Sequence, residues 1–78
     1  MARVLLFGRL ADIAGWRSRD VPGASIAEIR TVLAGDVELA EALAGPGVQV
    51  AVDREIVRGE AVLTAASEVA FMPPMSGG

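Results

Sequence analysis

The stretch SIAEIRTVLAG, residues 25–35, is the clearest helix signal in the chain. Ser25 and Glu28 form a capping box: the serine hydroxyl accepts a hydrogen bond from the amide three residues later, and the glutamate reaches back to the cap amide. Gly35 is a typical residue at which such a helix ends. Behind the box, apolar residues at helical spacing form one face: Ile26, Ile29, Val32 and Leu33. The segment therefore predicts an amphipathic helix that can cover a sheet.

Two short strands are predicted before this helix. The apolar run RVLLF (3–7) is compatible with a strand, and we expect it to be buried on both faces. GRLADIAG (8–15) has apolar residues at helical spacing and suits one or two helical turns. The more polar WRSRDV (16–21), closed by Pro22-Gly23, then completes a hairpin with a helical insertion at its bend.

Further elements are predicted after the helix. VELAEALA (37–44) follows an aspartate that can cap a second short helix. VQVAV (48–52) alternates as a strand does, with its valines on one face. A tight turn at Asp53-Arg54 then leads into a short return strand, EIV (55–57).

The last predicted strand, SEVAFM (67–72), places Val69 and Phe71 on one face, with Glu68, Ala70 and Met72 on the other. The prolines that follow end the strand, because neither can donate a hydrogen bond to the ladder. We expect Val69 to lie in the core and Phe71 at its edge. An exposed apolar patch, made of Phe71, Met72 and Met75, is predicted to be a docking surface.

The order of these elements is two strands, a helix and then further strands. It predicts an α+β fold of the β-grasp (ubiquitin-like) kind, a roll in which a mixed sheet is covered by a main helix. Seventy-eight residues make one domain, and an apolar content of 53% with few aromatics indicates an aliphatic core. We expect a β-grasp domain over residues 1–72 and a flexible, extended C-terminal Gly-Gly tail over residues 73–78.

Composition excludes several classes of chemistry. The chain has no cysteine or histidine, and its seven basic residues are all arginine. Disulfides, thiolate nucleophiles, the commonest metal ligands and the usual general base are therefore missing. We expect no bound cofactor or metal. A net charge of −3 argues against nucleic acid as a partner. No apolar stretch approaches the ~20 residues that span a bilayer, so we expect no membrane partner and a cytoplasmic location.

The ending FMPPMSGG (71–78) has features beyond those of a frayed terminus, which is the commoner explanation of such residues. Pro73-Pro74 stiffens the exit from the last strand. The six residues from Pro73 onward can reach roughly 20 Å at about 3.3 Å each. Without a Cβ, Gly77 and Gly78 can thread a narrow channel. The pattern indicates a carrier whose chemistry belongs to the carboxylate of Gly78.

The run EVAFMPPMSGG (68–78) resembles the ending of the small subunit of molybdopterin synthase, the MoaD-type sulfur carriers. FGRLADIAG (7–15) and AVDREIV (51–57) also resemble segments of that family. The resemblance covers essentially the whole chain. Departures from the family pattern include Asp53, where asparagine is common, and Met75, where valine is common. Neither touches the terminal glycines.

The resemblance implies a role for the chain as a sulfur-donating subunit that is not an enzyme alone. An activating enzyme would use ATP to adenylate Gly78, and a sulfur donor protein would convert it to a thiocarboxylate. The tail would then enter the large subunit of molybdopterin synthase, in a heterotetramer, and give its sulfur to cyclic pyranopterin monophosphate during molybdenum cofactor biosynthesis. Gly77 would thread the channel. The expected partner-binding residues are Phe71, Met72, Pro73, Pro74, Met75 and Ser76.

Three alternatives remain open. The sulfur carrier of thiamine thiazole synthesis is also a β-grasp protein with terminal Gly-Gly, although it is usually shorter and lacks the Pro-Pro-[Val/Met]-Ser spacing. A ubiquitin-like protein modifier is the second alternative. The absence of lysine forbids lysine-linked polymeric chains but not single conjugation. The third is a plain interaction module with an idle tail. The intact mass of the purified protein distinguishes these functions.

Overall fold

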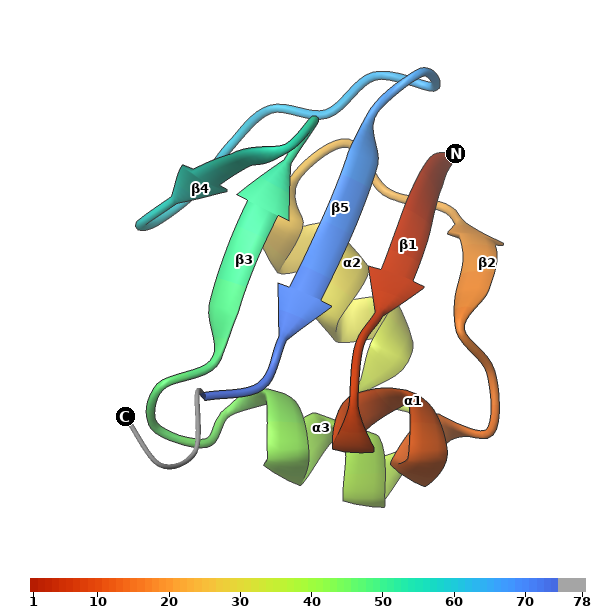
Figure 1. Cartoon of the computed structure of the whole chain (residues 1–78). Coiled ribbons are helices and arrows are strands. Elements are labelled where there is room, and N and C mark those ends of the chain that lie inside the picture. The colour runs from red at the N-terminus through yellow and green to blue at the C-terminus, as the bar shows by residue number, and fades with distance from the viewer. Residues whose placement is uncertain (75–78) are drawn as a thin grey trace.

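The computed structural model describes residues 1–74 and shows a five-stranded sheet with α2 crossing behind it and α1 and α3 at its lower end (Figure 1). The elements, in chain order, are β1 (Ala2–Leu6), α1 (Arg9–Ala14), β2 (Ser18–Val21), α2 (Ile26–Leu33), α3 (Val37–Leu43), β3 (Gln49–Val52), β4 (Glu55–Val57) and β5 (Glu68–Met72).

The strand order in the sheet is β2-β1-β5-β3-β4. The two central strands, β1 and β5, run parallel, and every other pair is antiparallel. The sheet is therefore mixed, and its main helix, α2, connects the first hairpin to the second half of the chain. This confirms the predicted α+β roll of the β-grasp kind.

Burial in β1 alternates, so the prediction that this strand is buried on both faces was wrong. Ala2, Val4 and Leu6 are buried, whereas Arg3 is exposed. Phe7, directly after the strand, is 48% exposed. The reason is that the helices pack against one face of the sheet, and the other face is left open to a partner or to solvent.

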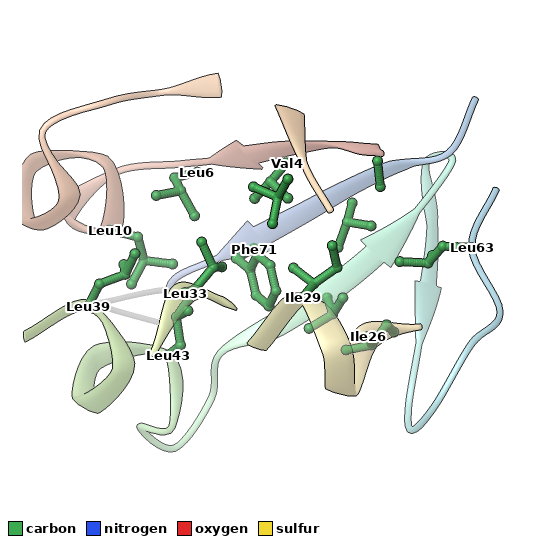
Figure 2. Packing of buried hydrophobic residues seen from close by; sticks show 14 residues of the cluster. Val4, Leu6, Leu10, Ile26, Ile29, Leu33, Leu39, Leu43, Leu63 and Phe71 are labelled. Carbon is green, nitrogen blue, oxygen red and sulfur yellow. The ribbon is translucent and has the colours of Figure 1, made fainter. Parts of the chain in front are cut away.

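Phe71 lies in the middle of the core, so its predicted place at the core's edge was wrong. The side chains of Val69 and Phe71 are both 0% exposed. In the sheet, Phe71 is paired with Leu6 on one side and Val50 on the other. Figure 2 shows its ring among the labelled core side chains, with Leu33 and Ile29 of α2 nearby. Because β5 is a central strand, both of its inward residues meet the helix layer.

The capping box of α2 is present with one change of partner. The Ser25 hydroxyl accepts a hydrogen bond from the Glu28 amide at 3.2 Å, as predicted. Glu28 accepts from the amide of Ala24, one residue before the predicted cap amide. The helix ends at Leu33, and Val32 is 46% exposed at the border of its apolar face. The inclusion of Val32 in the buried face was therefore wrong.

A second cap on α2 comes from a distant residue, Glu60. Its carboxylate accepts hydrogen bonds from the amides of Ile26 at 2.7 Å, Ala27 at 3.1 Å and Ala61 at 2.9 Å. These amides, led by that of Ala61, lower the pKa of Glu60 below its ordinary value, and the positive charge of Arg30 acts in the same direction. The carboxylate thereby ties the loop before β5 to the start of α2.

We predict that Glu60→Gln lowers the melting temperature at pH 7, because the substitution removes the charge that the amides stabilise. A carboxyl with a lowered folded-state pKa stabilises the fold above its unfolded pKa of about 4.3 and loses this contribution as pH falls through the folded value. The difference in melting temperature between wild type and variant should therefore shrink in acid. Glu41→Gln, an exposed change on α3, is the control. A Glu60→Gln difference that persists unchanged at low pH would contradict the cap.

The remaining local signals are confirmed with small shifts of boundary. The Asp36 carboxylate caps α3 by accepting from the Leu39 amide at 3.2 Å. Asp53 and Arg54 both have positive φ, 49° and 72°, which is the backbone of a tight hairpin turn between β3 and β4. Strand β2 begins at Ser18, two residues later than the predicted segment.

Candidate functional site

The exit of the C-terminal segment from the sheet is the feature around which a site can be built. β5 lies between β1 and β3, so its end is held on both sides. The Phe7 amide donates to the Phe71 carbonyl at 3.2 Å, and Met72 is paired with Gln49 of β3. Pro73 has no N–H to continue the ladder. The chain therefore leaves the fold from a central, firmly paired strand.

The predicted partner-binding residues divide into three groups. Phe71 is fully buried, so it supports the fold and offers no surface to a partner. Met72 and Pro73 are half-buried and Pro74 is exposed, so these three are accessible at the exit. The other two partner-binding residues, Met75 and Ser76, lie outside the described residues, and so do the predicted threading residue Gly77 and the predicted activated residue Gly78.

The open face of the sheet carries an apolar row beside the exit. Strand pairing places Leu5, Ala70, Ala51 and Ile56 next to one another across four strands. Ile56 is 49% exposed and Leu5 and Ala70 are half-buried, whereas Ala51, between Ala70 and Ile56, is buried. Met72 lies on the same face of β5 as Ala70, two residues further along. We refer to these five residues, Leu5, Ala51, Ile56, Ala70 and Met72, as the open-face row.

The sequence interpretation missed part of this surface. Phe7 was assigned to core or sheet packing, and Ile56 was not singled out. A signal was available for both: a sheet covered by one layer of helices must leave alternate residues of each strand uncovered. Only the pairing between distant strands shows that the uncovered apolar residues are contiguous.

The ion pair between Arg3 Nε and Asp20 Oδ1, at 3.1 Å on the open face, is exposed at both ends and contributes little to stability. Residues 1–74 contain no group of three or more acidic side chains placed to hold a metal ion. Within the same range, no helix has the length and apolar character needed to cross a bilayer.

Comparison with known protein families gives a match to the model of the ThiS family over residues 4–78. The match spans the whole fold and continues through the terminal glycines. The chain belongs to the ThiS family. This family consists of ubiquitin-like sulfur carriers of the ThiS/MoaD type, and the resemblance predicted from the sequence is confirmed at the level of the family.

Solved structures similar to this ThiS-family chain are archaeal modifiers. The crystal structure of SAMP1 from Haloferax volcanii has 28% sequence identity and a TM-score of 0.77, covering 99% of this chain and 98% of that chain. The solution structure of small archaeal modifier protein 1 from Methanosarcina acetivorans has 19% identity and a TM-score of 0.86, covering 99% and 95%. The latter supports the fold alone. A search of curated proteins gave no significant match.

Membership of the ThiS family changes how the exit is interpreted. Carriers of the ThiS/MoaD type work with activating enzymes and partner enzymes. The open-face row and the accessible residues at the end of β5 are therefore candidate contacts for such proteins.

Proposed function

We propose that this chain is the sulfur carrier subunit of molybdopterin synthase, with the carboxylate of Gly78 as the group that is activated. One observation carries the proposal. The ThiS-family match runs through Gly78, and the strand that leads to it is paired with β1 as far as Phe71 and with β3 as far as Met72. In this proposal the chain acts in the cytoplasm and binds no cofactor of its own.

The proposed chemistry begins with an inert group. A carboxylate is ionised at neutral pH and resists nucleophiles. An activating enzyme would transfer AMP from ATP to the carboxylate, releasing pyrophosphate. Sulfur from a donor protein would then displace AMP and leave a thiocarboxylate on Gly78. The absence of cysteine, histidine and lysine from the chain is consistent with all of these steps being catalysed by partners.

The thiocarboxylate would next be used by the large synthase subunit. We propose that Gly77 and Gly78 thread its channel, since a glycine pair has no side chain to obstruct entry. The sulfur would pass to cyclic pyranopterin monophosphate, with general acid and base groups supplied by the large subunit. Two sulfurs are needed per product, so a used carrier must leave and be recharged. A heterotetramer of two small and two large subunits is part of this proposal.

A second function is favoured by a specific observation, the similarity to SAMP1 from Haloferax volcanii at 28% identity over almost the whole chain. In that alternative the activated Gly78 would be joined to amino groups of target proteins. The two functions share adenylation and diverge afterwards. The thiamine thiazole carrier also shares adenylation and the thiocarboxylate, and differs in the enzyme that accepts the sulfur.

The intact mass of the protein purified from its own host distinguishes a sulfur carrier from a protein modifier. A mass gain equal to the replacement of one oxygen by sulfur supports a sulfur carrier, whereas a ladder of high-mass species supports conjugation. Purified thiocarboxylate should then be mixed with the large subunit and cyclic pyranopterin monophosphate. Formation of molybdopterin supports the proposal. Sulfur transfer only to thiazole synthesis, or only conjugates, would contradict it.

We predict that Met72→Glu weakens association with the large subunit by about 2 kcal/mol, the size of an interface hot spot. Met72 is half-buried on the open face beside Pro73. A partner that holds the tail needs contacts outside its channel, and the open-face row offers apolar ones. A calorimetric titration measures the effect, and the melting temperature of the free protein should change little.

Val62→Glu is the matched control for this prediction. Val62 is 86% exposed and forms an isolated bridge with Ser25, just before α2. The loop between β4 and β5, to which it belongs, joins β5 at the opposite end of that strand from the exit (Figure 1). The same charge is thus introduced at an exposed apolar residue far from the proposed interface, and the affinity should stay at the wild-type value. Equal affinities for the two variants would place docking on another face.

A further inference from the structure

Two glycines line the place where the C-terminal segment leaves the fold. A Cβ atom placed on Gly47 would lie 2.6 Å from the Cβ of Pro74, which is closer than two non-bonded carbon atoms approach each other. A Cβ placed on Gly8 would lie 3.1 Å from the Cγ of Pro73. The two prolines therefore rest directly against the backbone of two separate loops, and both contacts depend on the absence of a side chain.

The sheet topology explains why these loops meet the prolines. β1 runs parallel to β5, so the loop after β1, which contains Gly8, lies at the end of the sheet where β5 ends. β3 runs antiparallel to β5, so the loop before β3, which contains Gly47, lies at the same end of the sheet. The exit is thus flanked by two loops, one next to each neighbouring strand, and each loop contains a glycine.

A positive φ is not the only reason why position 47 needs a glycine. Gly47 has a φ of 82°, and Gly15 has almost the same φ, 83°, in the turn after α1. A Cβ on Gly15 would meet nothing within 4 Å. Both positions favour glycine because of their positive φ. Only Gly47 also needs glycine because another residue occupies the space of its side chain.

We propose that Gly8 and Gly47 form a seat for Pro73 and Pro74, and that this seat sets the direction in which the C-terminal segment is presented to the activating enzyme. The effect of the seat on activation rests on the proposed function, whereas the existence of the seat does not. Each proline has a fixed φ, so holding both rings restricts the base of the segment before binding. Less freedom then has to be lost when the carboxylate is bound. The two glycines are positioning residues.

The seat is tested first without any partner. In wild-type protein, nuclear Overhauser contacts are expected between the α protons of Gly47 and the β protons of Pro74, and between Gly8 and Pro73. Gly47→Ala should abolish the first contact. Absence of these contacts in the wild type would overturn the seat, whatever the function of the chain.

The consequence is tested by ATP–pyrophosphate exchange with the activating enzyme. Gly47→Ala and Gly15→Ala place the same Cβ at nearly the same φ, so both pay a similar cost in backbone strain. Only Gly47→Ala displaces Pro74. We expect its kcat/KM to fall about tenfold or more, as small misplacements of a reacting group do, while Gly15→Ala stays near wild type. Equal decreases would overturn the proposal. Gly8→Ala is not used as a quantitative test, because Gly8 combines a φ of 54° with a ψ of −134° and the substitution would add backbone strain that Gly15→Ala does not match.

A double-mutant cycle separates positioning from general damage. Pro74→Gly removes the Cβ that the new alanine would strike, so adding Gly47→Ala to Pro74→Gly should lower the exchange rate no further. An additive decrease would mean that Gly47 acts independently of Pro74 and would overturn the seat. If the wild-type chain itself gives no exchange, the proposed function fails, and the magnetic resonance measurement still decides the seat.

Discussion

Deletion of Gly78 is expected to abolish adenylation and sulfur transfer while leaving the fold intact. The reason is that the reactive group is the terminal carboxylate, and removing one residue withdraws it by about 3.3 Å from an active site that binds it in a fixed position. The core residues in the described part of the chain extend from Ala2 to Phe71, so we expect the stability not to depend on Gly78. ATP–pyrophosphate exchange measures activation, and a thermal melt measures the fold.

A variant with one alanine added after Gly78 is the matched control for this deletion. It lengthens the C-terminal segment by one residue, where the deletion shortens it by one, and it keeps both glycines. It should also be inactive, because the carboxylate is again misplaced and now carries a methyl side chain. Activity in either variant, or unfolding of the truncated protein, would contradict the assignment of Gly78 as the activated residue.

Phe71→Ala is expected to remove a large part of the free energy of unfolding. Truncation of a buried phenylalanine costs about 3–5 kcal/mol. At about 0.05–0.15 kcal/mol per residue, a chain of 78 residues has only about 4–12 kcal/mol of stability in total. The Phe71 ring is 0% exposed, and the Arg30 guanidinium lies 5.3 Å from its centroid. Urea denaturation followed by circular dichroism measures the loss.

The chain supplies its own control, because its only other phenylalanine is at the surface. Phe7 directly follows β1, and its side chain is 48% exposed. Phe7→Ala should therefore cost about 1 kcal/mol or less, in the range of surface substitutions. If the two variants lost equal stability, the burial of Phe71 would not be the main source of core packing energy. If Phe71→Ala kept the stability of the wild type and lost only partner affinity, the original interface assignment of Phe71 would be correct.

Features that depend on residues close together in the sequence could be predicted from it. The cap of α2 by Ser25, the cap of α3 by Asp36 and the turn at Asp53-Arg54 each involve groups within a few residues of one another. Strand alternation and helical spacing are also local patterns. Together with the order of the elements, they were sufficient to predict a mixed sheet covered by a main helix. The glycine ending pointed to the family.

Features that depend on contacts between distant segments were decided only by the tertiary structure. The depth of Phe71 follows from the central place of β5, which alternation along a single strand does not specify. Glu60 caps a helix more than thirty residues before it. Gly47 meets Pro74 because β3 runs antiparallel to β5. In each case the local sequence allows several environments, and the packing of strands and helices around one core selects among them.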